Sequence, residues 1–526
     1  TVIKRGLGEL VLTGEQLFNG VFQVETGNLR IGIGGTQGSL SGDVNLLTDT
    51  RLIFDRSDDA IFNGGTSGAG TVQKSGPGEL TVTDSLNHTG GTLLNSGILT
   101  IGNGGTTGDI SGDVITVVGT QLAFNRSDNI SVDANVSGAG TIVQRGDGVL
   151  TLTGNNTQSN GVLIENGTVA VDSDARLGSG DLIIDGGLLR YDAAFDNLRD
   201  IRLRSNGGGL DTNGFDVRYT GLITGNGPFI KQGNGRFLFT GSIAATLIDI
   251  QGGELQLGDA TPAGTITGDV NIAAGATLSL DVVGDVFFNG NLTGTGDFRH
   301  RNVGQLQLNG NYSLFAGQTF IEQGSLRLSG ALGGDLFMGD NTILKGVGNI
   351  GGNLSAGNGT TVTPGFSIGI LNIGGDFTLG AGSITEIEVN GTVAGSQSDV
   401  INVGGTATLD GTLRVLGLPG DYSGNARTFT FLNAGSISGQ FASIDDSELP
   451  FFDASVSYTG TSANLLVSRN GTGFNTVSLT ENQQAISTAI DEIETLDALN
   501  PVVVAITPLT AAQARAAFDE LHGDTL

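Results

Sequence analysis

The chain has 526 residues, with 90 glycines, 8 prolines and no cysteine, and its formal net charge is −29. Apolar residues make up 38% of the chain, which argues against disorder, because disordered chains lack the apolar area that offsets the entropy of ordering. The excess of 53 acidic over 24 basic residues opposes binding to nucleic acid or to an anionic membrane, since both need clustered Lys and Arg. No run of 18 apolar residues occurs, so we expect no transmembrane helix.

The absence of cysteine is compatible with two environments. Disulfides are rare in the cytosol, which gives one explanation. A chain exported through a narrow pore would also avoid disulfide-closed loops, and composition leaves both explanations open. The first six residues, Thr1-Val2-Ile3-Lys4-Arg5-Gly6, lack the features of a signal peptide and look like the middle of a repeat. We therefore expect the natural N-terminus to lie upstream.

A repeat of 70 residues begins at once. Gly8-Glu9-Leu10-Val11-Leu12-Thr13 returns as Gly78-Glu79-Leu80-Thr81-Val82-Thr83 and as Gly148-Val149-Leu150-Thr151-Leu152-Thr153. Alternation with period two predicts strands that bury one face, and glycine at the corners supplies positive φ. The same lag relates Arg56-Ser57-Asp58 to Arg126-Ser127-Asp128, which we interpret as solvated turns. The repeat predicts an all-β solenoid, a parallel β-helix.

Each 70-residue unit divides into three coils of about 23 residues, within the range of solenoid repeats. Each strand then pairs with the strand one coil away, so that Leu80 and Val82 point inward while Thr81 faces solvent. Leu10, Leu80 and Leu150 are separated by the repeat length. They are predicted to share one inward-facing column.

The strict lag fails after residue 172. Gly138-Ala139-Gly140 returns as Gly225-Asn226-Gly227 after 87 residues, so 17 extra residues lie between 172 and 225. They could form most of an extra coil or a lateral loop. Strand and turn character then continues to about residue 470.

The C-terminal end is predicted to be helical. Thr480 with Gln483, and Thr510 with Gln513, have the spacing of capping boxes, and apolar residues follow the first box at helical spacing. Pro501 and Pro508 interrupt the helical pattern. We expect two helices, the second ending near Gly523, and interpret them as a linker.

Several blocks in the second half resemble the C-terminal part of bacterial autotransporter passengers of the pertactin-like family. The glycine-rich strand repeats also resemble that family's passenger-associated repeat. The blocks are Pro364-Gly365-Phe366-Ser367-Ile368-Gly369, Gly374-Gly375-Asp376-Phe377-Thr378-Leu379, Ser398-Asp399-Val400, Gly405-Thr406-Ala407-Thr408-Leu409-Asp410-Gly411-Thr412-Leu413, Arg427-Thr428-Phe429-Thr430-Phe431 and Ala512-Gln513-Ala514-Arg515-Ala516-Ala517-Phe518-Asp519-Glu520-Leu521. Together they cover nearly the whole chain in the family's order.

This resemblance implies a right-handed parallel β-helix with a C-terminal cap and a short helical tail. Residues 1–390 would be the passenger helix, residues 391–470 a cap that assists folding outside the cell, and residues 471–526 a linker to an outer-membrane barrel absent from this sequence. The implied location is the bacterial cell surface or the extracellular space. The lack of cysteine then agrees with export through a pore.

Catalysis has few candidate residues. His88, His300 and His522 are the three histidines, far apart in the chain, with neither Ser-His-Asp nor metal-ligand spacing. We therefore predict no enzyme activity, no catalytic residues, no cofactor and no metal site.

Arg145-Gly146-Asp147 spells an integrin-type adhesive tripeptide and is the single weak binding candidate. The alternative is a glycine turn with drifting neighbours, because the equivalent residues are Arg5-Gly6-Leu7 and Ser75-Gly76-Pro77. Asp211-Thr212-Asn213-Gly214-Phe215-Asp216 suggests a calcium loop, but Thr220 stands where a bidentate Glu is needed, so we interpret it as a turn.

The sequence is compatible with two functions. The first is a surface adhesin or self-associating passenger that binds a host, a surface or another copy of itself by distributed contacts. The alternative is a passive stalk that presents an enzyme domain located before Thr1. A nucleic-acid partner is not expected.

Overall fold

The structure is a computed structural model that describes residues 1–261, 264–390, 397–418 and 426–523. It divides into two compact units. The first comprises Thr1–Asp259 with Ala263–Asn271, and the second comprises Ala260–Pro262 with Ile272–Leu526.

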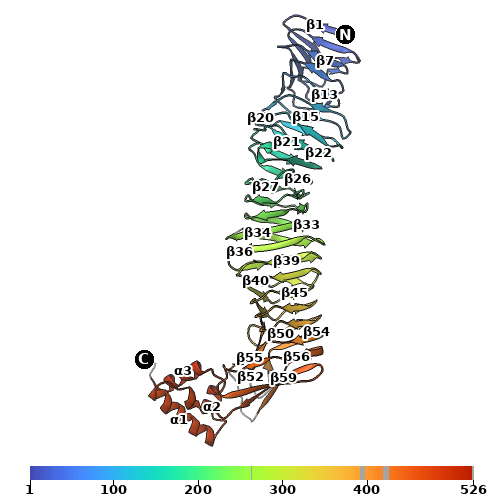
Figure 1. The fold of residues 1–526 in the computed structure, drawn as a ribbon. Coiled ribbons are helices and arrows are strands. Elements are labelled where there is room, and N and C mark those ends of the chain that lie inside the picture. The colour runs from blue at the N-terminus through green and yellow to red at the C-terminus, as the bar shows by residue number, and fades with distance from the viewer. Residues whose placement is uncertain (262–263, 391–396, 419–425, 524–526) are drawn as a thin grey trace. The chain divides into compact units, whose positions relative to one another are not determined.

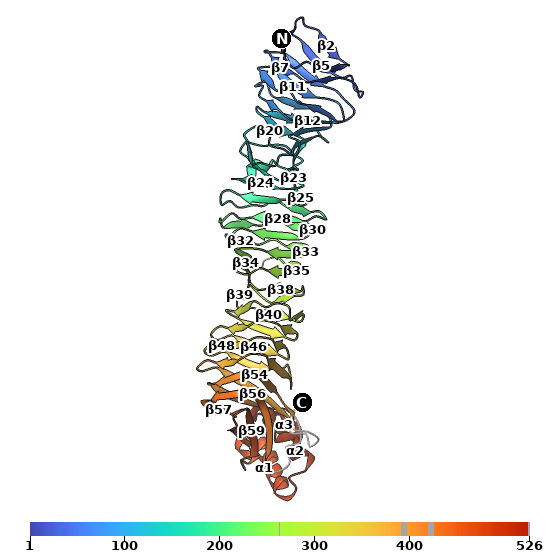
Figure 2. The same ribbon diagram turned by 90° about the vertical axis from the view of Figure 1, so that its right-hand side faces the viewer.

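In the first unit, short parallel strands stack coil upon coil, with three strands to a coil through the first repeats (Figures 1 and 2). Val2 lies opposite Phe22 and Leu80 opposite Leu99, so each strand pairs with a strand about one coil later. The predicted parallel β-helix is confirmed.

The strands of this unit fall on three faces. The first face holds β1 (Val2–Lys4), β4 (Val21–Val24), β7 (Asp43–Leu46), β10 (Thr66–Gly68), β13 (Ser85–Leu86) and β16 (Asp109–Ile110). The second holds β2 (Glu9–Leu12), β5 (Asn28–Ile31), β8 (Arg51–Phe54), β11 (Thr71–Lys74), β14 (Thr92–Leu94), β17 (Val114–Thr116) and β20 (Val136–Gly138). The third holds β3 (Glu15–Gln16), β6 (Ser39–Leu40), β9 (Ala60–Phe62), β12 (Glu79–Val82), β15 (Ile98–Ile101), β18 (Gln121–Phe124) and β21 (Thr141–Gln144).

The remaining strands of the first unit continue the stack. They are β19 (Ile130–Val132), β22 (Val149–Leu152), β23 (Val162–Ile164), β24 (Thr168–Val171), β25 (Leu182–Ile184), β26 (Leu188–Tyr191), β27 (Ile201–Leu203), β28 (Gly208–Asp211), β29 (Val217–Tyr219), β30 (Ile223–Gly225), β31 (Phe229–Gln232), β32 (Arg236–Phe239), β33 (Ile243–Ile250), β34 (Glu254–Thr261) and β35 (Ile266–Ile272).

The prediction that Leu10, Leu80 and Leu150 share a column is wrong. Leu10 pairs with Leu29 in β5, Leu80 lies between β9 and β15, and Leu150 lies between β19 and β24. These leucines belong to β2, β12 and β22, which are ten strands apart in chain order. Three strands make one coil, so ten strands make three coils and one strand more. Each 70-residue repeat therefore begins on the next of the three faces.

The predicted inward orientation is confirmed where strands lie on both sides. Leu80 and Leu150 are 2% and 0% exposed, while Thr81 is half-buried. Leu10 is 37% exposed, because β2 is the outermost strand of its sheet. Burying one leucine side chain contributes about 1.5–3 kcal/mol.

The 17 extra residues form part of an additional coil of the solenoid and not a lateral loop. β24 pairs with β26, and β26 pairs with β28, in unbroken parallel register across the region after residue 172. A 3-10 helix, η1 (Asp174–Leu177), precedes β25 and buries Leu177. The region therefore adds to the stack.

Tight glycine turns in this unit are closed from the inside by buried amines and amides. Lys231 Nζ donates to the carbonyl oxygens of Gly233 and Gly235 at 2.6 Å and of Gly252 at 2.8 Å. Gln144 Nε2 donates to two turn carbonyl oxygens at 2.8 and 3.0 Å, and Lys74 occupies a similar place. Burial lowers the pKa of Lys231 to about 8, which leaves it mainly charged at neutral pH. These side chains satisfy carbonyl groups that would otherwise be buried without a partner.

The second unit continues with parallel strands. They are β36 (Thr277–Val282), β37 (Val286–Phe288), β38 (Leu292–Gly294), β39 (Asp297–His300), β40 (Gln305–Leu308), β41 (Asn311–Tyr312), β42 (Gln318–Ile321), β43 (Ser325–Leu328), β44 (Ala331–Leu332), β45 (Leu336–Met338), β46 (Ile343–Gly346), β47 (Asn349–Ile350), β48 (Leu354–Ala356), β49 (Thr361–Pro364), β50 (Ile370–Ile373), β51 (Phe377–Leu379), β52 (Ile384–Asn390), β54 (Val400–Leu409), β55 (Thr412–Leu418), β56 (Arg427–Gly439) and β57 (Ser443–Asp445).

This unit also contains antiparallel strands. β53 (Gln397–Ser398) pairs antiparallel with β52. β59 (Ser462–Arg469) pairs antiparallel with both β56 and β58 (Phe452–Tyr458). An antiparallel hairpin thus covers the last long strand of the stack, and a covered strand offers no open edge for pairing with another chain.

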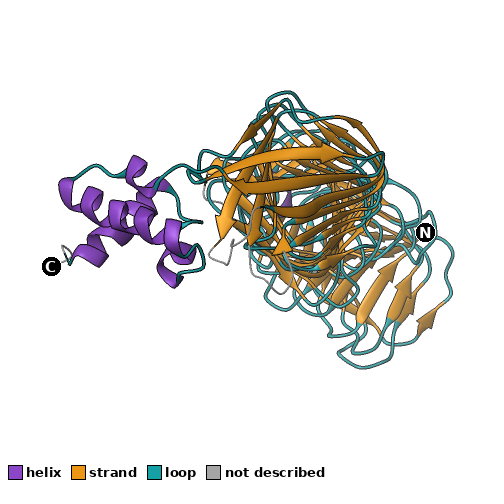
Figure 3. Ribbon diagram, turned by 90° about the horizontal axis from the view of Figure 1, so that it is seen from below, coloured by secondary structure: helices purple, strands orange, loops and turns teal. Residues whose placement is uncertain are grey.

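Three helices follow a 3-10 turn, η2 (Phe474–Val477), and gather in one group (Figure 3). They are α1 (Glu481–Leu496), α2 (Pro501–Ile506) and α3 (Ala511–His522). Phe474, Ile490, Val503 and Phe518 pack with Phe451, which directly precedes β58, in one buried cluster. The helices therefore share a core with the end of the strands.

The second capping box is confirmed, with both Thr510–Gln513 bonds present. At the first box, Thr480 Oγ1 accepts from the Gln483 backbone N–H, but the Gln483 side chain accepts from Leu479 N–H instead. Pro501 does not simply interrupt: it begins α2, because proline is tolerated in the first helical turn. No helix in the described part of the chain is long and apolar enough to cross a membrane.

Candidate binding surface

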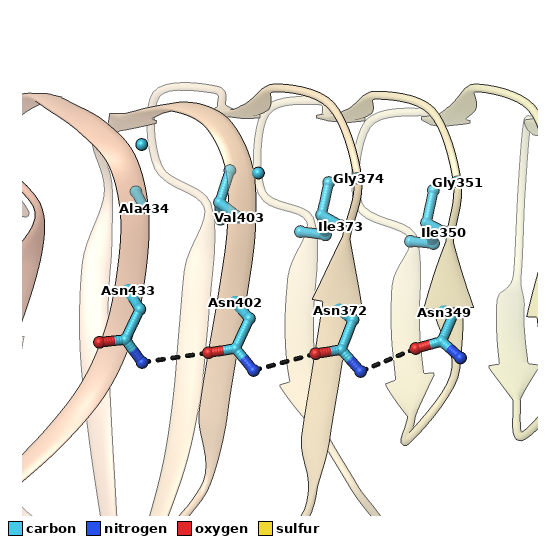
Figure 4. Close-up of a pocket in the computed structure, with 12 residues that line it drawn as sticks. Asn349, Ile350, Gly351, Asn372, Ile373, Gly374, Asn402, Val403, Asn433 and Ala434 are labelled. Carbon is cyan, nitrogen blue, oxygen red and sulfur yellow. Dashed lines mark hydrogen bonds between the residues drawn. The ribbon is translucent and has the colours of Figure 1, made fainter.

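An asparagine ladder runs across four coils of the second unit (Figure 4). Asn372 Nδ2 donates to Asn349 Oδ1 at 2.7 Å, and Asn402 Nδ2 donates to Asn372 Oδ1 at 2.9 Å. Asn433 Nδ2 donates to Asn402 Oδ1 at 3.0 Å. The four residues come from β47, β50, β54 and β56 and lie opposite one another in the strand register.

Glycine corners follow the ladder residues. The sequence Asn-Ile-Gly-Gly occurs at 349–352 and 372–375, Asn-Val-Gly-Gly at 402–405, and Asn-Ala-Gly at 433–435. A Cβ on Gly374 would clash with the carbonyl oxygen of Gly351, and one on Gly404 would clash with that of Gly374. Glycine is needed here because adjacent coils approach closely at the corner.

The ladder forms one side of a shallow groove of about 550 Å³. Its lining is uncharged and consists of Asn349, Ile350, Gly351, Asn372, Ile373, Gly374, Asn402, Val403, Gly404, Asn433, Ala434 and Gly435. The aliphatic side chains are largely buried, whereas the first glycine of each corner is exposed. The groove therefore offers mainly apolar carbon to a ligand, with the ladder amides along one side.

Two further rows lie beyond the glycine corners. Asp335, Asn353 and Asp376 each use Oδ1 to accept a backbone N–H from the next coil, at 2.7 to 2.8 Å. An outward column follows, in which facing residues are Arg299, Phe320, Phe337, Ser355, Thr378, Thr408 and Ser438. The phenylalanine rings stack at 5.0 Å between centroids.

The Asn ladder retains hydrogen-bonding capacity. An amide carries two N–H donors and an oxygen with two lone pairs, and a ladder bond uses one donor and one lone pair. Aligned amides also polarise one another, which strengthens the remaining bonds. The surface can therefore bind groups that both donate and accept hydrogen bonds.

Arg145-Gly146-Asp147 lies on the first unit, directly after β21. The Arg145 guanidinium is 24% exposed and contacts Glu165 at 3.0 Å and Glu79 at 3.4 Å. Gly146 is buried, where a Cβ would clash with the carbonyl oxygen of Arg126. Asp147 is exposed and accepts a hydrogen bond from Asn166. The arginine is thus already paired with carboxylates of other coils.

The three histidines are not gathered into one site. His88 is buried, with Nδ1 2.8 Å from Thr66 Oγ1 and Nε2 3.1 Å from the Gly91 oxygen. His300 is buried with Nε2 3.0 Å from the Gly304 oxygen, and His522 ends α3. Burial lowers the pKa of His88 and of His300, which favours neutral rings. Within the described residues, no cluster of three or more His, Cys, Asp or Glu could hold a metal ion.

The remaining sequence motifs have structural partners. The Asp211–Asp216 segment forms a turn in which Asn213 has φ 50° and its N–H donates to Asp211 Oδ1 at 2.8 Å. The expectation of a solvated Arg-Ser-Asp turn is wrong at Arg126, whose side chain is 12% exposed. Its guanidinium binds Asp128 at 2.7 Å and also a carbonyl oxygen of the preceding coil, because inter-coil bonding draws it inward.

Two blocks that were noted separately in the sequence meet at Asp399. This buried carboxylate accepts the Gly369 N–H with Oδ1 and the Glu388 N–H with Oδ2, each at 2.8 Å. Burial raises the pKa of Asp399 to about 7 and also raises the pKa of Glu388. Asp399 therefore ties the Pro364–Gly369 segment to β52.

Sequence reasoning missed the asparagine ladder. Its signal was the Asn-Ile-Gly-Gly recurrence, but the intervals between Asn349, Asn372, Asn402 and Asn433 are unequal. A search for a fixed repeat length does not align them.

The chain is similar to a known repeat family. The Passenger-associated-transport-repeat family matches residues 2–31, 72–101 and 142–171. These segments start at intervals of the 70-residue repeat.

Two curated relatives are exported proteins. The chain is 28% identical over 251 residues to "Adhesin BmaC autotransporter" of Brucella suis biovar 1 (strain 1330), covering 45% of this chain and 7% of that protein. It is 28% identical over 224 residues to "Extracellular serine protease" of Serratia marcescens, covering 41% of this chain and 20% of that protein. The crystal structure of the Haemophilus influenzae Hap adhesin matches with a TM-score of 0.33 and 11% identity, covering 88% of this chain and 63% of that one.

Proposed function

Because this chain belongs to the family of bacterial autotransporter passengers, we propose that it acts as an adhesin or self-association protein through contacts distributed along its outer surface. Passengers of this family are located at the cell surface or in the extracellular space, and so is this chain.

The observation that carries the proposal is the asparagine ladder. Four outward amides and their glycine corners repeat along the coils, where coil packing requires glycine but the strand register does not require asparagine. The preceding coil shows this directly, since Ala331 occupies the place of asparagine beside Gly333-Gly334. An array of this kind supports binding by many weak contacts, and linked contacts increase avidity.

The relative from Brucella suis supports the same proposal, since it is described as an adhesin. Arg145-Gly146-Asp147 stays a weak candidate for a second contact point. The guanidinium of Arg145 would have to leave Glu165 and Glu79 to engage a partner.

The wider organisation also belongs to the proposal. Residues 1–390 would form the displayed passenger, residues 391–470 a cap that assists folding outside the cell, and residues 471–526 the link to an outer-membrane barrel. The antiparallel pairing of β56, β58 and β59 supports a capping role for the middle segment.

A second candidate is a stalk that presents an enzyme domain located before Thr1. The relative from Serratia marcescens, described as an extracellular serine protease, favours it. In that case the solenoid would hold the enzyme away from the membrane.

The test is adherence of bacteria that display the full-length protein, with purified residues 1–526 added as a soluble competitor. An adhesin would promote attachment or aggregation, and the competitor would inhibit it. Adherence that the competitor leaves unchanged, together with enzyme activity lost on deletion of the region before Thr1, would favour the stalk.

A further inference from the structure

We propose that the groove beside the asparagine ladder binds a neutral glycan chain, whose sugar rings follow one another along the direction in which the coils stack. This inference rests on the proposed adhesive function and names the class of ligand for the surface formed by Asn349, Asn372, Asn402 and Asn433.

The hydrogen-bonding chemistry of the ladder suits a sugar. Sugar hydroxyl groups donate and accept at the same time, and each ladder amide keeps at least one N–H and one oxygen lone pair after its ladder bonds. The ladder bonds of 2.7 to 3.0 Å hold the amides in place before a ligand arrives. Such preorganisation reduces the entropy lost on binding.

The spacing of the ladder amides also favours a glycan. Paired strands lie ~4.8 Å apart, so the amides recur at that interval, which is close to the length of one pyranose ring in an extended glycan. An extended peptide advances ~3.3 Å per residue, and its like-facing groups recur at about twice that interval. A glycan can therefore meet successive amides with successive rings, whereas an extended peptide falls out of step.

The charge around the groove favours a neutral ligand. The groove lining is uncharged, while the chain as a whole carries a net charge of −29. Asp335 and Asp376 lie across the glycine corners, beside the groove. A sulfated or carboxylated glycan would be repelled, so the surface selects a neutral one.

The outward column beyond the glycine corners also suits a sugar. Ser355, Thr378 and Thr408 continue in register into the stacked rings of Phe337 and Phe320. Hydroxyl groups suit sugar hydroxyls, and the apolar face of a sugar ring packs against aromatic carbon. These residues extend the same neutral chemistry on the far side of the glycine corners, and the column becomes charged at Arg299, which faces Phe320.

The experiment measures binding of residues 1–526 to cellohexaose, maltohexaose and a heparin hexasaccharide by titration calorimetry. The test variant is Asn372→Leu with Asn402→Leu, which removes two central amides but keeps side-chain size. The control is Gln307→Leu, an outward amide of β40 on a different sheet. Circular dichroism and trypsin resistance establish that all the proteins are folded.

We expect at least one neutral hexasaccharide to bind and the heparin hexasaccharide not to bind. The double variant should lose about tenfold or more in affinity, equal to about 1.4 kcal/mol, while the control stays close to the parent. The inference is overturned if no neutral hexasaccharide binds, if heparin binds equally well, or if the double variant is unchanged.

Adherence of displaying cells separates this inference from the proposed function. If cells adhere equally with and without Asn372 and Asn402, the glycan inference fails and the adhesive function stands. If displaying cells neither adhere nor aggregate, the proposed function itself fails. Loss of glycan binding together with adherence in the double variant supports both.

Discussion

The glycine turns of the first unit and the glycine corners of the second solve the same packing problem with different side chains. Around Lys231, a buried amine satisfies turn carbonyl groups from inside the coil. Around Gly374, glycine lets the coils approach, and the polar side chains of the asparagine ladder lie outside. The buried amine of Lys231 uses its hydrogen bonds to stabilise the fold, whereas the amides of the asparagine ladder keep donors and acceptors that a ligand can use.

Charge differs between the units as well. Lys231 is a buried cation that donates to carbonyl oxygens, and Asp399 is a buried carboxylate that accepts two backbone N–H groups. Isolated buried charges are costly, and burial shifts the pKa of each group toward its neutral form.

The largest effect is expected for the pH dependence set by Asp399. Its pKa is raised to about 7 from 3.8, so between these pH values the folded state holds a proton that the unfolded state has released. The free energy of unfolding should therefore fall as pH rises through that window, by at most about 4 kcal/mol. Urea denaturation of the parent and of Asp399→Asn across the window measures it. Identical pH slopes in the two proteins would contradict the assignment.

The next largest effect is expected for Lys231→Met. The change leaves buried carbonyl groups without donors and should lower the free energy of unfolding by about 3 kcal/mol. Lys74→Gln is the matched control, because Gln144 fills the corresponding place with an amide. Denaturation of both variants is the measurement, and equal losses would show that the side-chain donor is unimportant.

Gly374→Ala is expected to lower the free energy of unfolding by a smaller amount, about 1–3 kcal/mol. The new Cβ would clash with the carbonyl oxygen of Gly351 and overpack the corner. Gly460→Ala is the control, since a Cβ there meets no atom within 4 Å. Thermal unfolding compares them. A harmless Gly374→Ala would mean that coil approach does not depend on glycine.

The smallest effect on stability is expected for Asn402→Leu. The ladder amide is partly exposed, and hydrogen bonds at such sites contribute about 1 kcal/mol or less. Chemical denaturation should show that the free energy of unfolding changes by less than about 1 kcal/mol. A loss as large as that of Lys231→Met would assign the ladder to the fold and remove the contrast between the two units.

Local features of the fold were predictable because they depend on neighbouring residues. Period-two alternation placed Leu80 inward, and the Thr510–Gln513 spacing placed the start of α3. The column of Leu10, Leu80 and Leu150 was not predictable, since the lag counts residues and not strands per coil. Ten strands per repeat cannot be read from a 70-residue interval.

The candidate surface was not predicted for a related reason. The asparagines that form it are separated by unequal numbers of residues, and the register that aligns them exists after folding. The contact between Asp399 and Gly369 likewise joins residues 30 apart across neighbouring strands. Sequence patterns identified the blocks that contain Gly369 and Asp399, but they did not predict the hydrogen bond between these residues.

The role of the asparagine ladder in binding is tested by the adherence of bacteria that display the full-length protein with Asn372→Leu and Asn402→Leu, compared with bacteria that display Gln307→Leu. We expect both proteins to be displayed and to resist trypsin equally, with adherence or aggregation reduced in the ladder variant alone. Equal adherence of the two variants would contradict the claim that the asparagine ladder is a binding surface.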